Sequence, residues 1–275
     1  MTPREQEELR GLYARIEDLS DRAGQGELSA TCFLSPREAY FAACYLERLG
    51  VPYYAYGGYR EAERKRLYLL PDYMPFGEEQ PEPDTELDSL WTSHLAAYGY
   101  ESDISVVKIC GSGYRALTHR DYLGAILGLG LERSVIGDIR VLEESACAAV
   151  FCDAAIAGFL EGEMTKVAND KVRLCRVSAA EIRIPPRRVE PIHDTVASCR
   201  LDCVIAALCG LSREKARETV CGGLVEMNFE SEDRPDRVVC APTLLSVRGF
   251  GRYRVIALTD RTKKGRIRLE AERYV

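Results

Sequence analysis

The clearest chemistry in this sequence belongs to basic side chains in its last third. Arg213 and Arg217 are four residues apart, so they lie on one face of the helix that the surrounding sequence predicts. Ser212 is a preferred N-cap residue, and a capped helix start carries free N–H groups and a partial positive charge. Guanidinium groups beside such a helix start are suited to phosphate. On pattern alone, an exposed helix face paired with Glu214 and Glu218 explains these residues equally well.

The C-terminal tail favours the phosphate interpretation. "SVRGFGRYR" (Ser246–Arg254) places arginines between aromatic residues and glycines, whose missing Cβ lets a backbone approach a phosphate. "RGFG" also fits the start of the RNA-stacking strand of an RRM domain, but Arg252 and Tyr253 break that pattern. "TKKGR" (Thr262–Arg266) predicts a hairpin turn with two exposed lysines. The candidate RNA-binding residues are Arg200, Ser212, Arg213, Lys215, Arg217, Arg248, Arg252, Arg254, Lys263, Lys264 and Arg266.

The charge distribution agrees with one surface for a polyanion. The chain has 275 residues and a net charge of −6, which alone argues against nucleic acid. From Arg183 onward, however, 18 Lys/Arg stand against 13 Asp/Glu, whereas the rest carries 19 against 30. A basic C-terminal third on an acidic body predicts a localised electrostatic contact.

Cysteine and histidine usage predicts neither a metal site nor a cofactor. The 11 cysteines form no C-x-x-C pair, and none of the three histidines lies near a pair of cysteines at zinc-site spacing. We therefore expect reduced core thiols in a cytoplasmic protein. No apolar run is long enough to cross a bilayer, and the charged N-terminus does not look like a secretory signal.

Two breaks in composition predict three modules. "PFGEEQPEPDTELD" (Pro75–Asp88) is acidic and proline-rich, and "RIPPRRVEP" (Arg183–Pro191) is a second linker or an extended entry strand. The expected domains are an N-terminal α/β module (1–78), an RRM-like plait (79–182) and a basic RNA-binding domain (183–275). The fold class is therefore α+β.

The element order in each module follows from periodicity and caps. The first module has helices at 3–23 and 36–49, the second opened by Ser35 and closed by Gly50. The second module has the order β-α-β-β-α-β of a ferredoxin-like plait, but its strands lack stacking aromatics except Phe151. The third has two helices, with Gly210 ending the first, followed by strands predicted at 224–229, 237–240, 244–249, 252–259 and 266–272.

Motifs that could indicate catalysis lack their partners. "HRD" (His119–Asp121) has no downstream Asn and no glycine-rich loop with its lysine, so Asp121 is predicted to start a helix. "GSG" (Gly111–Gly113) is a strand-to-helix turn. We therefore predict no catalytic residues.

One stretch resembles a known binding module. "RLDCVIAALCGLSREKARETVCGGLVEMN" (Arg200–Asn228) is similar to the S-four-type RNA-binding domain, whose pattern is R-L-D, then S-R-x-x-A, then Gly before V-x-V-N. Two departures, "CAPT" at Cys240–Thr243 and Glu226 and Glu230 around Asn228, predict an altered turn and weaker RNA contact. The matching residues are Arg200, Leu201, Asp202, Ser212, Arg213, Ala216, Gly222 or Gly223, Val225 and Asn228.

The whole chain resembles the bacterial YlmH family. The resemblance rests on "YAYGGYREAERKRL" (54–67), "THRDYLGAILGLGLERSVIGDI" (118–139), and "SVRGFGRYR" with "TKKGR" near the end. It implies a cytoplasmic, monomeric protein that associates with the large ribosomal subunit through rRNA, possible tRNA contact included. It also implies a role in ribosome-associated quality control of stalled chains, and a link to cell division is sometimes proposed.

Two other functions stay open at this point. Pseudouridine synthases and rRNA methyltransferases also carry this binding module, but Asp202 lies outside the G-R-L-D-x-x-T context of the former. A methyltransferase needs a doubly wound sheet with a glycine-rich cofactor loop, which the plait does not offer. A cell-division adaptor that binds protein through the acidic first two modules is the third possibility.

Overall fold

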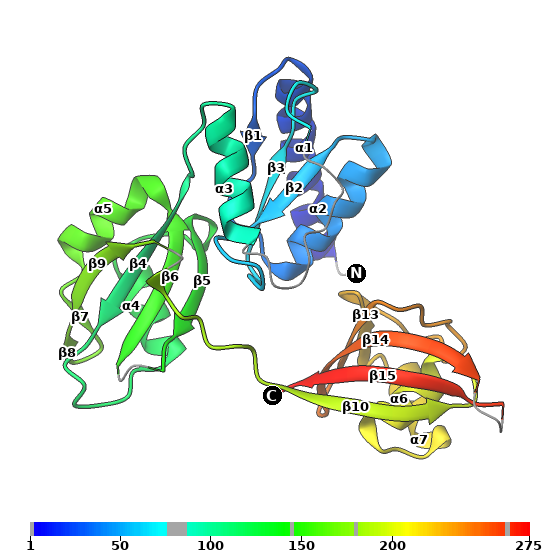
Figure 1. Cartoon of the computed structure of the whole chain (residues 1–275). Helices are drawn as coiled ribbons and strands as arrows, with labels where there is room; N and C mark the ends of the chain where they lie inside the picture. The colour runs from blue at the N-terminus through cyan, green and yellow to red at the C-terminus, as the bar shows by residue number, and fades with distance from the viewer. Residues whose placement is uncertain (1–2, 76–86, 144–145, 179–180, 262–264) are drawn as a thin grey trace. The chain divides into compact units, whose positions relative to one another are not determined.

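The computed structural model divides into two compact units, residues 4–185 and residues 186–275 (Figure 1). The division falls inside the second predicted linker, whereas the predicted linker at Pro75–Asp88 lies almost wholly outside the described residues. The structure describes the chain except for residues 1–2, 76–86, 144–145, 179–180 and 262–264.

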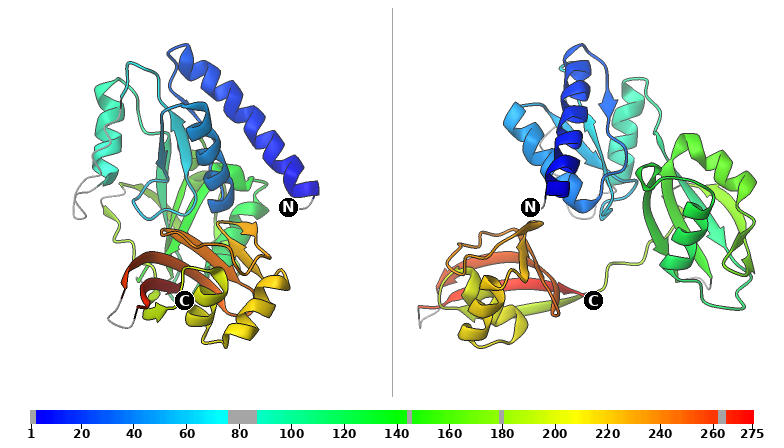
Figure 2. Two further views of the ribbon diagram at one scale, coloured as in Figure 1. Left: turned by 90° about the vertical axis from the view of Figure 1, so that its right-hand side faces the viewer. Right: turned by 180° about the vertical axis from the view of Figure 1, so that it is seen from behind.

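The N-terminal part of the first unit is a small antiparallel sheet, ordered β1-β3-β2, between α1 and α2 on one side and α3 on the other (Figure 2). The predicted cap of α2 is confirmed: the Ser35 hydroxyl accepts the N–H of Glu38, whose carboxylate accepts the N–H of Ser35. Gly50 ends this helix with a φ of 69°. The elements are α1 (Pro3–Gly24), β1 (Ser29–Ala30), α2 (Pro36–Leu49), β2 (Tyr53–Tyr56), β3 (Arg66–Leu69) and α3 (Leu87–Ala97), which was not predicted.

The rest of the first unit holds a four-stranded antiparallel sheet, ordered β5-β6-β4-β9, with α4 and α5 on one face. A short β7–β8 hairpin, absent from the prediction, precedes the last strand. Thr118 and Asp121 form a capping box at α4, as predicted for a helix start. The elements are β4 (Ile104–Cys110), α4 (His119–Gly128), η1 (Arg133–Val135), β5 (Ile136–Val141), β6 (Cys147–Asp153), α5 (Ala154–Glu163), β7 (Lys166–Val167), β8 (Asp170–Lys171) and β9 (Arg173–Val177).

Both faces of this sheet are covered at its two central strands, β4 and β6. Side chains alternate between the faces along each strand. Val107 and Val150 face α4 and α5 in one apolar cluster. Val106 and Phe151 face the other way and share a second cluster with the N-terminal part of the unit. The Phe151 ring lies 4.8 Å from the Tyr59 ring, centroid to centroid, and has no solvent exposure.

Polar contacts also hold the four-stranded sheet against the N-terminal part of the first unit. Arg66 is buried and donates to the carboxylates of both Asp103 and Asp153. Asp138 is also buried and accepts one side-chain hydroxyl and two backbone N–H groups from residues 59–64. Because buried carboxylates need several donors, these contacts fix the segment 59–66 against the larger sheet.

The second unit is a six-stranded antiparallel sheet, ordered β10-β15-β14-β13-β11-β12, with α6 and α7 against one face (Figure 1). Its core joins Leu201 and Val204 of α6 to Val220 of α7 and to Tyr253 and Val255 of the sheet. The elements are β10 (Val189–Val196), α6 (Leu201–Cys209), α7 (Arg213–Cys221), β11 (Val225–Met227), β12 (Glu230–Ser231), β13 (Thr243–Val247), β14 (Gly251–Arg261) and β15 (Ile267–Tyr274).

One predicted strand of this unit is wrong. Residues 237–240 form a loop with a single bridge between Val238 and Arg200. The loop is used for capping instead: the N–H groups of Leu201 and Asp202 donate to carbonyls at Arg237 and Pro235. These two N–H groups at the start of α6, which have no partner within the helix, are thereby hydrogen-bonded by another part of the chain.

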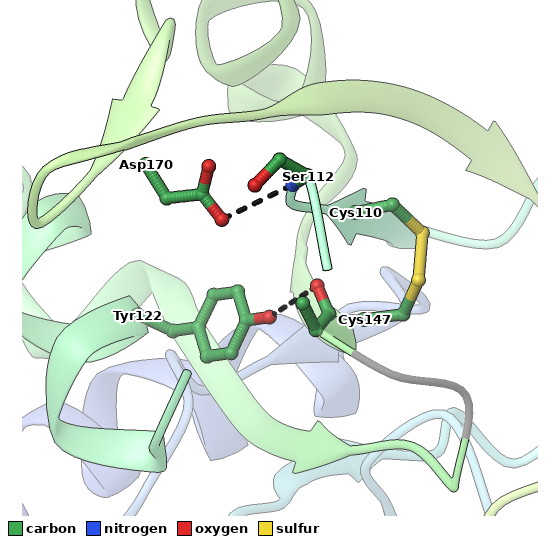
Figure 3. Close-up of a disulfide and its surroundings, with 6 residues drawn as sticks. Cys110, Ser112, Tyr122, Cys147 and Asp170 are labelled. Carbon is green, nitrogen blue, oxygen red and sulfur yellow. Dashed lines mark hydrogen bonds between the residues drawn. A yellow bond between two sulfur atoms is a disulfide. The ribbon is translucent and has the colours of Figure 1, made fainter. Parts of the chain in front are cut away.

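The expectation of reduced thiols is wrong for two cysteines. Cys110 and Cys147 are opposite residues on β4 and β6, with Cα atoms 4.2 Å apart, and a disulfide joins them (Figure 3). Residues directly opposite on antiparallel strands come close enough for such a bond. Sequence spacing does not reveal this pair because the two cysteines are 37 residues apart.

Candidate nucleic-acid interface

A buried carboxylate holds two arginines at the surface of the second unit. Asp202, in the first turn of α6, is only 2% exposed. Its Oδ1 accepts the Nε–H of Arg200 at 3.1 Å, and its Oδ2 accepts the Nε–H of Arg213 at 3.4 Å. The Arg213 side chain is nevertheless 62% exposed. Its remaining N–H groups therefore reach solvent in a fixed orientation, which suits recognition of phosphate oxygens.

The charge of this cluster is positive. Burial disfavours the ionised form of Asp202, but hydrogen bonds from Arg200 and Cys203 and the charges of Arg200 and Arg213 outweigh it. The pKa of Asp202 therefore lies below its ordinary value. At neutral pH one negative charge is shared by two guanidinium groups. The cluster can attract an anion without leaving a charge unpaired in the interior.

The N-terminal end of α7 adjoins the cluster through Arg213. The predicted cap is confirmed, since the Ser212 hydroxyl accepts the N–H of Lys215 at 3.3 Å. Lys215 and Arg217 are exposed on the same helix. This end of α7 thus gathers four of the predicted residues beside Arg200, with the positive end of a helix dipole among them.

The strand arginines lie on a different face. Along β14 the buried Tyr253 and Val255 alternate with the exposed Arg252 and Arg254. Because Tyr253 and Val255 pack under α6 and α7, the two arginines leave the sheet on the side away from the helices. Arg254 lies opposite Glu272 of β15 there. The structure therefore separates the predicted residues into two groups. The helix-face group is Arg200, Ser212, Arg213, Lys215 and Arg217, and the sheet-face group is Arg252 and Arg254.

Of the remaining candidates, Arg248 and Arg266 lie in different parts of the second unit. Arg248 is exposed in the turn between β13 and β14, and its N–H donates to the carbonyl of Leu224, just beyond α7. Arg266 donates to the hydroxyl of Thr195 at 2.8 Å, so it fastens β15 to β10. Lys263 and Lys264 lie outside the described residues.

Sequence reasoning missed one residue of the helix-face group and two arginines of the loop that caps α6. Asp202 was assigned to the binding helix but not to the site, although its position two residues after Arg200 was a usable signal. Arg234 and Arg237 lie in the loop that caps α6, and each contacts the carboxylate of Glu232. No sequence pattern links them to α6, because the loop folds back over that helix.

The sheet of residues 100–181 offers no open stacking face at β4 and β6. Phe151, the one aromatic that a base could stack on in its third strand, is covered by Tyr59. A Cβ on Gly58 would come within 2.3 Å of the Phe151 ring, so the covering segment lies in direct contact with it. RNA therefore has no access to that ring in this structure.

The described residues contain no helix that is long and apolar enough to span a bilayer. Nor do they contain a group of three or more His, Cys, Asp or Glu side chains arranged to hold a metal ion.

Comparison with known proteins gives the family. A family model described as "Putative RNA-binding domain in YlmH" matches residues 100–181. The ribosome-associated protein quality control protein P2 of Bacillus subtilis (strain 168) is 33% identical over 249 residues, which cover 90% of this chain and 88% of the relative. The chain belongs to the YlmH family. The resemblance noted in its sequence is confirmed to that extent.

A solved structure also matches this YlmH-family chain. The cell division protein ylmH from Streptococcus pneumoniae is 22% identical, with a TM-score of 0.45, over 67% of this chain and 97% of that one.

Proposed function

We propose that this protein is a non-catalytic RNA-binding protein that associates with the large ribosomal subunit. It would contact rRNA, peptidyl-tRNA or both, and act in quality control of stalled chains. The proposal includes three parts: an N-terminal α/β module, an RRM-like plait at residues 79–182 and an S-four-type RNA-binding domain at residues 183–275. The Bacillus subtilis relative, named for ribosome-associated protein quality control, supports this assignment.

One observation carries the proposal: Asp202 holds Arg200 and Arg213 beside the capped start of α7. Fixing an arginine in advance lowers the entropy lost when it binds phosphate. A helix start, two oriented guanidinium groups and the exposed Lys215 form a compact cationic surface. Such a surface reads backbone phosphates and the shape of a structured RNA rather than its sequence.

The same geometry argues against the enzyme alternatives. Asp202 is buried and its two oxygens accept from arginines, so it is not available as the catalytic aspartate of a pseudouridine synthase. Every strand pair among the described residues is antiparallel, whereas the cofactor site of a methyltransferase needs a parallel doubly wound sheet.

The test is binding of the full-length protein to purified large subunits, followed by crosslinking and sequencing of the bound RNA. The double variant Arg213→Glu/Arg217→Glu should weaken binding by tenfold or more, on the order of 1.4 kcal/mol. If about five phosphates are contacted, the logarithm of the affinity should fall with the logarithm of salt at a slope of roughly −3 to −4.

Two matched charge reversals serve as controls. Arg10→Glu/Arg22→Glu on α1 makes the same change in charge in the other unit and should bind like wild type. Arg252→Glu/Arg254→Glu tests the opposite sheet face and should cause a smaller loss. A flat salt response, or equal binding by the Arg213/Arg217 variant and wild type, would contradict the proposal.

A further inference from the structure

Residues 100–181 present an exposed aromatic at the end of the sheet, away from its buried faces. The loop after β4, residues 111–118, carries Tyr114, which is 97% exposed. No other large apolar residue among the described ones is as exposed. A single exposed aromatic is unremarkable by itself, so its surroundings decide its meaning.

The loop that carries Tyr114 is firmly anchored. The N–H of Gly111 donates to the carbonyl of Ala146 at 2.8 Å, and the N–H of Ser112 donates to the Asp170 carboxylate at 3.1 Å (Figure 3). A Cβ on Gly111 would lie 2.6 Å from the same carboxylate, so the backbone of Gly111 is in close contact with Asp170 of β8. The Tyr114 N–H in turn donates to the Ser112 hydroxyl at 3.3 Å. These contacts hold the loop in place while the ring projects into solvent.

The charge around the ring is positive. Five of the nine Lys/Arg between residues 100 and 181 lie in two short segments, the loop with the start of α4 and the stretch from β7 to the first residue of β9. The two acidic residues of these segments, Asp121 and Asp170, both accept backbone N–H groups, and Asp121 also accepts from the Arg115 guanidinium at 3.3 Å. The five basic residues, all exposed, are Arg115, Arg120, Lys166, Lys171 and Arg173.

The two segments border a common groove. Ser112, Lys171 and Arg173 line it, and Tyr114 lies two residues beyond Ser112. The lining residue from α5 is Glu161, whose carboxylate is paired with Arg176 at 2.8 Å. An aromatic ring beside a basic groove is the arrangement with which proteins bind single-stranded nucleic acid, since every base can stack and every nucleotide carries a phosphate.

We propose that Tyr114 stacks on an unpaired RNA base while Arg115, Lys171 and Arg173 hold the adjoining phosphates. This rests on the proposed RNA-binding function and adds a second contact of a different kind. The helix face at α7 binds structured RNA through its phosphates. The Tyr114 loop takes a single-stranded segment, such as a flipped or looped nucleotide.

The experiment compares Tyr114→Ala with Tyr114→Phe in the full-length protein. Affinity is measured by fluorescence anisotropy for a short unstructured RNA and for a duplex of the same length. Tyr114→Ala should lose about five- to a hundredfold for the unstructured RNA, the range expected for one stacked base. Tyr114→Phe keeps the ring and should stay within about twofold of wild type. Neither change should alter the affinity for the duplex or the unfolding temperature, because the side chain is exposed.

The outcomes separate this inference from the function it rests on. If wild type binds neither large subunits nor RNA, the proposed function fails and this inference with it. If wild type binds and the Arg213/Arg217 variant does not, but Tyr114→Ala equals wild type, only the stacking site is overturned. If Tyr114→Ala lowers binding to large subunits but not to the unstructured RNA, the loop contacts protein, which also overturns it.

Discussion

At the scale of single residues, Asp202 governs the chemistry of the helix-face group. It is the only side chain that hydrogen-bonds both Arg200 and Arg213 in the described part of the chain. The Asp202 carboxylate is buried, whereas both guanidinium groups are partly exposed. The negative charge of Asp202 is therefore neutralised by two arginines that lie at the surface. Orientation of the arginines and stability of the unit therefore depend on the same acid.

The lowered pKa of Asp202 predicts how stability depends on pH. A carboxyl group with a lower pKa in the folded state stabilises that state at neutral pH, and this contribution is lost as pH falls from about 4 through the folded-state value. Asp202→Asn should lower the free energy of unfolding by about 1–3 kcal/mol at pH 7, and by less below pH 4. Denaturant titrations at several pH values would measure both.

The matched control is Glu214→Gln, which removes an exposed carboxylate from α7. It should leave the free energy of unfolding within about 0.5 kcal/mol of wild type. An Asp202→Asn protein as stable as this control at pH 7 would show that the carboxylate is dispensable.

At the scale of elements, the four-stranded sheet is a core layer with no free face at β4 and β6. Gly58 lies against this sheet with a φ of 95°, where a side chain is strained, and a Cβ added there would lie 2.3 Å from the Phe151 ring. The covering segment therefore depends on glycine for two separate reasons.

Gly58→Ala should accordingly destabilise the first unit by about 2–4 kcal/mol, combining overpacking with backbone strain. Gly99→Ala is the matched control, because Gly99 has a φ of 79° but no atom within 4 Å of the added Cβ. It should cost about 1 kcal/mol. Calorimetry of the full chain would compare the two variants, and equal losses would mean that Phe151 is not covered as described.

Local rules predicted the helices well and the tertiary contacts poorly. Ser35, Ser212, Gly50 and Gly210 each mark a helix boundary that the structure shows, because capping depends on neighbouring residues only. The burial of Phe151 depends on a segment about ninety residues earlier, which no local pattern encodes. The predicted strand at 237–240 failed for the same reason, since the Arg237 carbonyl caps α6 instead of joining the sheet.

The positions of the candidate RNA-binding residues in the fold were also predicted only in part. Helix spacing correctly grouped Arg213, Lys215 and Arg217 on α7. It could not show that Arg252 and Arg254 leave the sheet on the opposite side, because that depends on which strand positions pack under the helices. Nor could it show that Asp202 holds the arginines.

At the scale of the whole molecule, charge and chain organisation agree. The second unit contains the basic third of the sequence, and the first contains most of the acidic excess. An acidic unit in the same chain as a cationic one limits non-specific attraction to nucleic acid. Binding is thereby expected to depend on the oriented arginines rather than on total charge.

The disulfide between Cys110 and Cys147 has a consequence for protease mapping of this molecule. The segment it closes contains the loop of Tyr114, where Arg115 is exposed. A trypsin nick after Arg115 would leave both fragments covalently joined, so they should migrate as one band until dithiothreitol is added. Two bands without reductant would show that the cysteines are free thiols. Digests resolved only under non-reducing conditions would therefore miss cleavage in the loop of Tyr114.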